Sequence, residues 1–176
     1  MERRLVIKQI LIMAGGLALL PSCLRDKGKS TIQLSRIDVS LDQENLLAAI
    51  AETLIPKTDT PGARELKLHL FVLKMLDDCY EADEQQQFME GLHDFESLVD
   101  EKFAKTFDKL SKKEREEALL ATEKLGKSKN ALSTFYQIMK ERTIGGYLNS
   151  KYVMTNLVVY ELVPGRYNGY FPVKTA

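Results

Sequence analysis

Residues that form metal and redox centres are scarce in this sequence. Its 176 residues include two cysteines, two histidines and no tryptophan. Two cysteines cannot build a disulfide framework, and two histidines leave little from which to form a zinc or haem site. An excess of one charge is also missing, because 25 Lys and Arg residues face 25 Asp and Glu residues. A neutral chain has no long-range attraction for nucleic acid, so we expect no nucleic-acid partner.

Motifs that bind cofactors are missing as well. No Gly-x-Gly-x-x-Gly follows a strand-like segment, and no Cys-x-x-Cys-His is present to attach a c-type haem. His69 and His93 fall on separate predicted helices, where we expect surface or half-buried positions rather than ligands. Cys79 is a buried small hydrophobe or a free thiol, and the frequent burial of free cysteines favours the first. We therefore expect no catalytic, cofactor-binding or metal-binding residue in this chain.

The first 22 residues have the layout of a secretory signal. Arg3, Arg4 and Lys8 provide a positive start, and an apolar run follows over residues 10–20. Because this run has 11 residues, it is too short to cross a hydrocarbon core of about 30 Å as a permanent helix. We predict a signal peptide over residues 1–22.

The end of this signal resembles a bacterial lipobox. Leu20-Pro21-Ser22-Cys23 places a large apolar residue three positions before a cysteine and a small residue directly before it. In a lipobox the cysteine thiol carries the lipid, and two or three acyl chains give a stable anchor. The alternative is a buried structural cysteine after a core helix, but the order of the features favours lipidation. The prediction is a lipid-anchored protein of the bacterial cell envelope that faces the periplasm, with the inner or outer membrane left open.

A second export signal overlaps the first. Arg3-Arg4-Leu5-Val6-Ile7-Lys8 resembles the twin-arginine motif, and Gly15 and Gly16 soften the apolar run as in many twin-arginine signals. The chain departs from that motif at Glu2 and Val6, where Ser or Thr and Phe are usual. The alternative is an ordinary Sec lipoprotein signal. The motif favours the twin-arginine route, which moves folded proteins.

The remainder of the chain predicts an all-α protein, a single compact helical domain of about five helices. We expect a polar tether over residues 23–39 and the helical domain over residues 40–176. No convincing period of two precedes residue 150, whereas apolar residues recur at spacings of three and four. Helix starts are indicated by Ser40 with Gln43, Thr60 with Pro61, Asp83 with Gln86, and Ser111 with Glu114, and a fifth helix by Leu132, Phe135, Ile138 and Met139.

The pattern changes after residue 143. Gly145 and Gly146 interrupt the helical spacing, and Pro164-Gly165 and Asn168-Gly169 indicate turns. We expect an irregular, tyrosine-rich C-terminal tail. Its tyrosines either seal the tail onto its own helices or contribute to a partner surface, since tyrosine combines a large contact area with a polar tip.

Two segments resemble the gluconate 2-dehydrogenase subunit 3 family. Residues 51–63 read Ala-Glu-Thr-Leu-Ile-Pro-Lys-Thr-Asp-Thr-Pro-Gly-Ala and match the signature E-x-[IL]-I-P-x-T-D-T-P-G-A. Residues 143–150 and 160–169 are similar to the C-terminal pattern of the same family. The resemblance covers residues 40 to 172, and the segment between residues 83 and 140 is ordinary amphipathic helix.

The resemblance implies a cofactor-free small subunit that binds, escorts for export and anchors a membrane-associated sugar or polyol dehydrogenase. In that family the large subunit is an FAD-containing flavoprotein of the glucose–methanol–choline type, and a cytochrome c subunit with haem c often accepts the electrons. The lipobox departs from the family and implies that this small subunit is itself the membrane anchor. The alternative is a stand-alone envelope lipoprotein that binds a sugar or another envelope protein. Candidates for partner docking are the residues matched to the family segments, together with Tyr170 of the tail, namely Pro56, Asp59, Pro61, Gly62, Tyr147, Tyr160, Pro164, Tyr167 and Tyr170.

The first family segment has a structural interpretation beside the docking one. Pro56 ends one helix, Asp59 can accept backbone hydrogen bonds in an Asx-type turn, and Thr60-Pro61 can start the next helix. Gly62 allows a close backbone approach. The segment is therefore either a connector kept for its geometry or a docking loop, and in neither case an active site.

Overall fold

The protein is all-α, as the spacing of its apolar residues predicts. The computed structural model describes residues 28–125, 130–158, 165 and 168–170. None of the helices in these ranges is long and apolar enough to cross a membrane. The described helices are α2 (Leu41–Leu54), α3 (Leu68–Cys79), α4 (Ala82–Phe103), α5 (Lys112–Leu125) and α6 (Ala131–Leu148), with a 3-10 turn η1 (Phe107–Lys109) and a π-helical turn η2 (Val153–Leu157).

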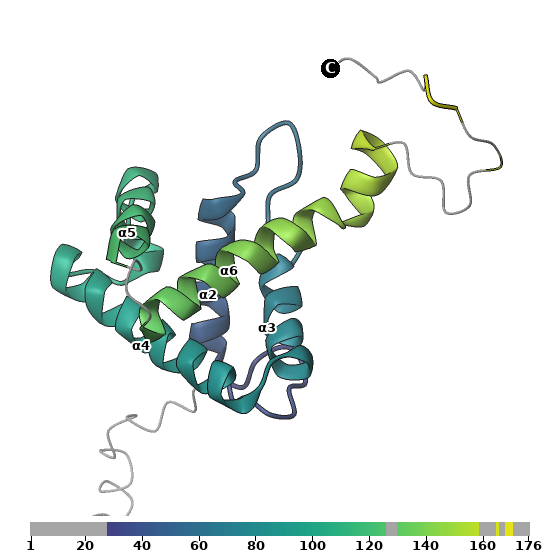
Figure 1. Cartoon of the computed structure of the whole chain (residues 1–176). Coiled ribbons are helices and arrows are strands. Elements are labelled where there is room, and N and C mark those ends of the chain that lie inside the picture. Colours follow the sequence, from purple (N-terminus) through teal and green to yellow (C-terminus); the bar gives the residue numbers. More distant parts are fainter. Residues whose placement is uncertain (1–27, 126–129, 159–164, 166–167, 171–176) are drawn as a thin grey trace, which may run out of the picture.

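Helix α6 is the central element of the bundle. It crosses the molecule diagonally in front of α2, which has α3 beside it, and it contacts α2, α3, α4 and α5 (Figure 1). Three fully buried rings join α4 to α6, because Phe135 lies 5.0 Å from Phe88 and 5.7 Å from Phe95 between ring centroids. These distances suit aromatic pairs and add to the free energy gained by burying the rings. The core is therefore built around α6.

Two of the predicted helix starts are confirmed. The Ser40 hydroxyl accepts the Gln43 N–H at 3.2 Å, and the Gln43 side chain accepts the Ser40 N–H at 2.9 Å. Ser111 and Glu114 make the same reciprocal pair at 3.4 and 2.7 Å. In both cases the side chains satisfy N–H groups that have no partner within the first helical turn.

The predicted start of the third helix at Asp83 is wrong by one or two residues. Helix α4 begins at Ala82, and the Glu81 N–H donates to the Glu84 carboxylate at 3.3 Å. The reason is the buried Gln85, whose amide donates to the Leu76 carbonyl at 2.9 Å and to the Tyr80 carbonyl at 3.1 Å. These bonds fix the turn between α3 and α4 and so determine where α4 starts.

The predicted polar tether over residues 23–39 is corrected where the structure describes it. Residues 28–39 pack against the helices, with Val39 buried and Ile32, Leu34 and Ile37 in contact with the core. The segment also pairs with the start of α2, where the Leu41 N–H donates to Gly28 O at 2.6 Å. It is part of the domain because its apolar side chains pack on the core surface.

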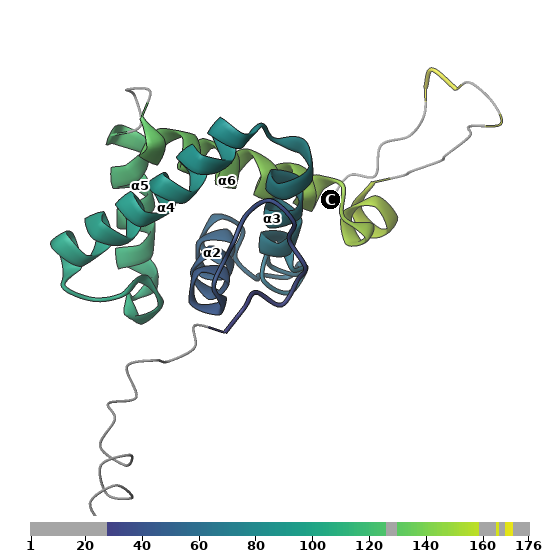
Figure 2. The ribbon, with the colours of Figure 1, turned by 90° about the horizontal axis from the view of Figure 1, so that it is seen from below.

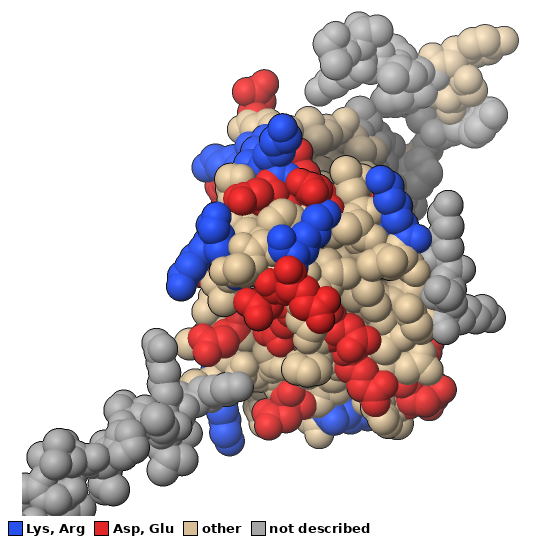
Figure 3. Space-filling model, turned by 90° about the vertical axis from the view of Figure 1, so that its left-hand side faces the viewer, with Lys and Arg blue, Asp and Glu red and all other residues tan. Residues whose placement is uncertain are grey.

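The outer side of the bundle carries both signs of charge. In Figure 3 acidic side chains form a band across this side, and basic side chains gather above it. Ion pairs also join neighbouring helices, since Lys102 lies 2.9 Å from Glu117 and Lys140 lies 2.6 Å from Glu123. The start of α5 also carries both signs of charge, because Lys112, Lys113, Glu116 and Glu117 are all exposed.

Candidate functional site

The loop between α2 and α3, residues 55–64, is the candidate site, and we call it the signature loop. One carboxylate near the end of α2 fixes its shape. Glu52 Oε1 accepts the Lys57 N–H at 3.0 Å, and Glu52 Oε2 accepts the Arg64 N–H at 2.9 Å. Hydrogen bonds to a charged acceptor are stronger than neutral ones. The first and last parts of the loop are therefore joined through a single side chain.

Gly62 is required by this bridge. It is buried, and a Cβ atom there would lie 2.6 Å from the Lys57 nitrogen and 2.7 Å from both Glu52 carboxylate oxygens. No side chain fits at those distances without displacing the bridge. The predicted close approach of the Gly62 backbone is thus found within the domain, where it brings Ala63 N–H to 2.9 Å from Ile55 O.

Thr60 and Pro61 do not start a helix, which corrects the sequence prediction. Helix α3 begins at Leu68, and residues 63–67 form turns that end at Lys67 with a left-handed φ of 54°. Thr60 instead receives the Thr58 N–H on its carbonyl oxygen at 3.0 Å. The backbone N–H groups of the loop bond to Glu52 and to local acceptors as far as Arg64, so they are not available for the first turn of a helix.

Asp59 does not form the predicted Asx-type turn. The N–H groups of Lys57 and Arg64 bond to Glu52, and that of Thr60 lies 3.4 Å from Thr58 Oγ1. The Asp59 side chain is exposed instead. Its carboxylate is therefore open to water and to a partner.

The end of α6 meets the signature loop. The Tyr147 hydroxyl donates to Thr60 Oγ1 at 3.0 Å, across 87 positions of sequence. Gly145 and Gly146 do not break the helix, contrary to the sequence prediction, because α6 continues to Leu148. A Cβ at Gly146 would lie 2.8 Å from the Phe71 ring. Glycine at this position therefore lets α6 approach α3, which places Tyr147 against the loop.

The surface formed by this meeting is partly apolar. Phe71 exposes 41% of its area, although it packs against α6, and Tyr147 is half-buried. Pro56 and Asp59 are exposed on the same loop as Thr60, to which Tyr147 bonds. We call Pro56, Asp59, Thr60, Phe71 and Tyr147 the docking surface. A rigid loop with one free carboxylate and neighbouring rings suits protein contact, since aromatic residues dominate the cores of interfaces.

The other predicted site residues fall into three groups. Pro61 is half-buried within the signature loop, whereas Tyr170 is 97% exposed in the tail. The export and lipidation residues Arg3, Arg4, Lys8 and Cys23, and the tail residues Tyr160, Pro164 and Tyr167, lie outside the described residues.

Two expectations for single reactive residues are corrected. His69 is buried rather than at the surface or half-buried, and its Nδ1 has no hydrogen-bond partner among the described residues. Burial lowers the pKa of His69, and the charges of Arg64 and Lys67 add to this effect against that of Glu44. Cys79 is exposed rather than buried, because it is the last residue of α3 and its side chain lies away from the core. Among the described residues no three His, Cys, Asp or Glu side chains gather as a metal site.

Two buried carboxylates were missed by the sequence analysis. Glu44 accepts the Thr31 N–H at 2.6 Å and the Thr31 hydroxyl at 2.7 Å. Asp77 accepts the backbone N–H groups of Ser35, Arg36 and Ile37 at 2.9, 2.7 and 3.2 Å. We call these two residues the carboxylate clamp. The signal in the sequence was an acid within an apolar helical stripe, three residues before Leu47 in one case and directly after Leu76 in the other.

The electrostatics of the clamp follow from its hydrogen bonds. Burial by itself raises the pKa of Asp77, but the three backbone N–H groups and the charge of Lys74 outweigh it. The pKa of Asp77 therefore lies below its ordinary value, so the residue is a charged acceptor at neutral pH.

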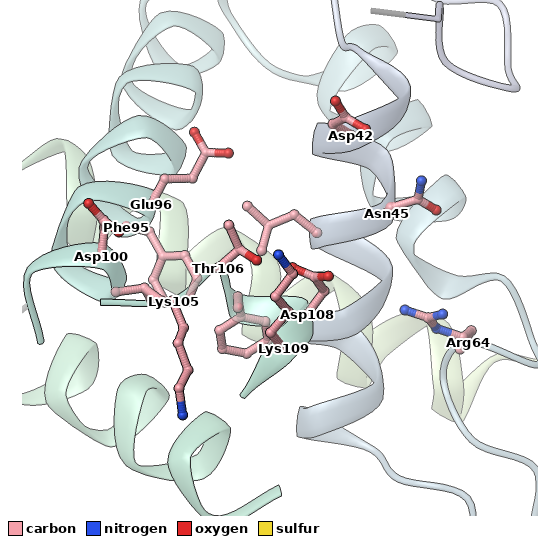
Figure 4. A pocket seen from close by; sticks show the side chains of 13 residues that line it. Asp42, Asn45, Arg64, Phe95, Glu96, Asp100, Lys105, Thr106, Asp108 and Lys109 are labelled. Carbon is pink, nitrogen blue, oxygen red and sulfur yellow. The ribbon is translucent and has the colours of Figure 1, made fainter. Parts of the chain in front are cut away.

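A hollow of about 710 Å³ lies between α2, α4 and η1 (Figure 4). Charged side chains from several directions form its rim, among them Asp42, Arg64 and Lys105. The two rings that line it, Phe95 and Phe107, are 0% and 3% exposed. They offer no ring face on which a sugar could stack, so the hollow gives no support to the alternative function of sugar binding.

The comparison with known families gives one match. The sequence model described as Gluconate 2-dehydrogenase subunit 3 matches residues 41–165 of the chain. This range begins at the first residue of α2 and includes both the signature loop and α6. No curated protein and no solved structure matches the chain.

Proposed function

The chain belongs to the gluconate 2-dehydrogenase subunit 3 family, and we propose on that basis that it is a cofactor-free accessory subunit. It binds an FAD-containing dehydrogenase of the glucose–methanol–choline type that oxidises a sugar or polyol, with a cytochrome c subunit as the electron acceptor. It escorts this large subunit through the twin-arginine route and anchors it to the envelope through lipidated Cys23. The large subunit performs the chemistry, and this chain supplies position and transport.

The observation that carries the proposal is the bond between Thr60 and Tyr147. These residues belong to the two separate segments that resemble the family, and the fold joins them at 3.0 Å in one exposed surface. A connector kept only for its geometry needs Glu52 near the end of α2 and the buried Gly62 within the loop. It does not need an exposed Asp59 or a ring at Phe71 that is 41% exposed. The exposed residues therefore favour docking of the large subunit.

The docking role is tested by co-purification. The tagged chain is expressed with the flavoprotein large subunit of the proposed complex, and bound flavin is measured by its absorbance. We expect Asp59→Arg to reduce recovered flavoprotein about tenfold, which corresponds to about 1.4 kcal/mol at the interface. The matched control is Asp94→Arg, which reverses an exposed carboxylate on α4. Full recovery with Asp59→Arg would exclude the signature loop from the interface, and no flavoprotein with the natural chain would refute the proposal.

The escort role needs a separate experiment in cells. The double substitution Arg3→Lys and Arg4→Lys changes the twin-arginine motif while keeping its charge. We expect both the chain and the dehydrogenase activity to remain in the cytoplasm, as measured by fractionation. If the activity still reaches the envelope, the escort role is wrong even where the two subunits bind.

A further inference from the structure

The two ends of helix α2 have different surroundings. Its first residue, Leu41, lies beside the segment of residues 28–40, which crosses beneath the ends of α2 and α3 (Figure 2). We call this segment, the start of α2 and the end of α3 the anchor end. The last residue of α2, Leu54, leads into the signature loop at the opposite end of the bundle (Figure 1). Since α2 has 14 residues, the two ends are separated by about 20 Å along its axis.

The carboxylate clamp fixes residues 28–40 at the anchor end. Glu44 on α2 binds Thr31, and Asp77 on α3 binds the backbone of residues 35–37. Both carboxylates are buried, at 5% and 1% exposure, and Val39 closes the segment onto the core at 2%. If the N–H groups that satisfy a buried charge were removed, the charge would be left unpaired, and this would strongly destabilise the fold. The segment therefore stays on the domain and adds no free length to the N-terminal connection.

The number of residues between Cys23 and the domain is small for this reason. Only residues 24–27 separate Cys23 from Gly28, and a fully extended chain spans at most about 18 Å over these five steps. If residues 28–40 were a free tether, the same connection to Leu41 would reach about 60 Å. The clamp thus reduces the distance that the domain can move from a lipid at Cys23 by about two thirds.

We propose that the lipid-anchored protein lies with its anchor end against the bilayer surface and presents the signature loop away from it. This inference rests on the lipidation of Cys23 that is part of the proposed function. The surface at the anchor end suits a lipid headgroup region of either charge, because Lys29 and Arg36 are balanced by Asp38 and Asp42, all four exposed. The docking surface then lies about 20 Å farther from the membrane, so the large subunit binds from the aqueous side.

The chain contains a thiol suited to test this orientation. Cys79 is exposed at the end of α3, and it is the second of two cysteines, so lipidation of Cys23 leaves it alone to react. A donor fluorophore on Cys79 reports the anchor end. A donor at the signature loop is obtained with Asp59→Cys in a chain that also carries Cys79→Ser. The lipidated proteins are placed in phosphatidylcholine vesicles that contain a headgroup-labelled acceptor.

We expect energy transfer from Cys79 to be at least twofold stronger than transfer from position 59. Equal transfer from the two positions, or stronger transfer from position 59, would overturn the proposal. The acyl chains on Cys23 are measured by mass spectrometry in the same samples. A protein without acyl chains refutes the anchor itself, whereas an acylated protein with equal transfer refutes only the orientation.

A matched control changes the connection without touching the fold. A flexible insertion of about twelve Gly and Ser residues between Lys27 and Gly28 restores the reach of a free tether. We expect this insertion to bring the two transfer efficiencies close to equality, because the domain can then turn and leave the surface. An unchanged difference would show that the short connection does not set the orientation, and would overturn the physical basis of the proposal.

Discussion

Single buried side chains decide how the N-terminal part of this protein is organised. Asp77 lies within the apolar stripe of α3, where an unpaired carboxylate would be costly to bury. Three consecutive N–H groups at residues 35–37 satisfy it and leave its charge in place. Glu44 plays the same part for Thr31. These two residues convert a polar stretch into a fixed part of the domain.

Replacing Asp77 tests this explanation through pH. Because the folded pKa of Asp77 is lowered, its stabilisation is complete above the ordinary value of 3.8 and disappears as the pH falls through the folded pKa. We expect Asp77→Asn to lower the free energy of unfolding by about 2 kcal/mol at pH 7, because an amide replaces a charged acceptor. Urea unfolding at pH 7 and at decreasing acid pH measures the free energy of unfolding of both proteins. We expect the two free energies to converge in acid.

Asp78→Asn is the matched control for this measurement. Asp78 is exposed and pairs with Lys74 at 2.9 Å on the surface of α3. Surface ion pairs contribute little to stability, so we expect little change at either pH. If Asp77→Asn behaved in the same way, the carboxylate clamp would not stabilise the fold.

At the scale of elements, the ends of the helices depend on different residues. Ser40 and Ser111 cap their helices as the sequence predicts, through partners three residues away. Helix α4 ends in the left-handed conformation that favours glycine, but the residue there is Ala104, with φ at 50°. Its N–H donates to Asp100 O at 2.8 Å in the position that favours glycine.

The C-terminal cap of α4 predicts that an alanine-to-glycine substitution stabilises the protein at the cap but destabilises it inside a helix. We expect Ala104→Gly to raise the free energy of unfolding by about 1 kcal/mol, since glycine reaches the left-handed region without steric cost. The control is Ala121→Gly in the middle of α5, which should lower the same quantity by about 1 kcal/mol. Thermal unfolding of the two variants decides the point, and a destabilised Ala104→Gly would contradict the role of the left-handed cap.

At the scale of the whole molecule, the folded unit begins earlier than the periodic helices do. Residues 28–39 cover core residues and contribute Val39 to the buried set. The family match begins at residue 41. The stable unit of this protein therefore includes a segment that precedes the matched range.

Two shortened chains separate these boundaries. A chain that begins at Gly28 keeps the clamp and should unfold at nearly the same temperature as the chain without its signal. A chain that begins at Leu41 loses Val39 and removes the N–H groups that Glu44 and Asp77 accept. We expect its free energy of unfolding to fall by at least about 3 kcal/mol. Circular dichroism against temperature measures both chains. Equal stability of the two would mean that residues 28–40 are only loosely attached.

The sequence alone determined the features that depend on near neighbours. The all-α class follows from apolar spacings of three and four, and the caps at Ser40 and Ser111 follow from pairs three residues apart. The family also followed from the sequence, because its signature is continuous over residues 51–63 and its match extends over residues 41–165. Lipidation at Cys23 and export through Arg3 and Arg4 remain predictions of the same local kind.

The tertiary structure decided what depends on contacts between distant residues. Asp77 binds a segment about 40 positions earlier, and Tyr147 binds Thr60 across 87 positions. The first bond fixes residues 28–39 to the domain, where the sequence predicted a tether. The second brings the two family segments together in one surface. Local periodicity reports which face of a helix is buried, but it does not report what that face meets. The position of the docking surface opposite the anchor end was therefore set by packing, which brings together atoms that the sequence keeps apart.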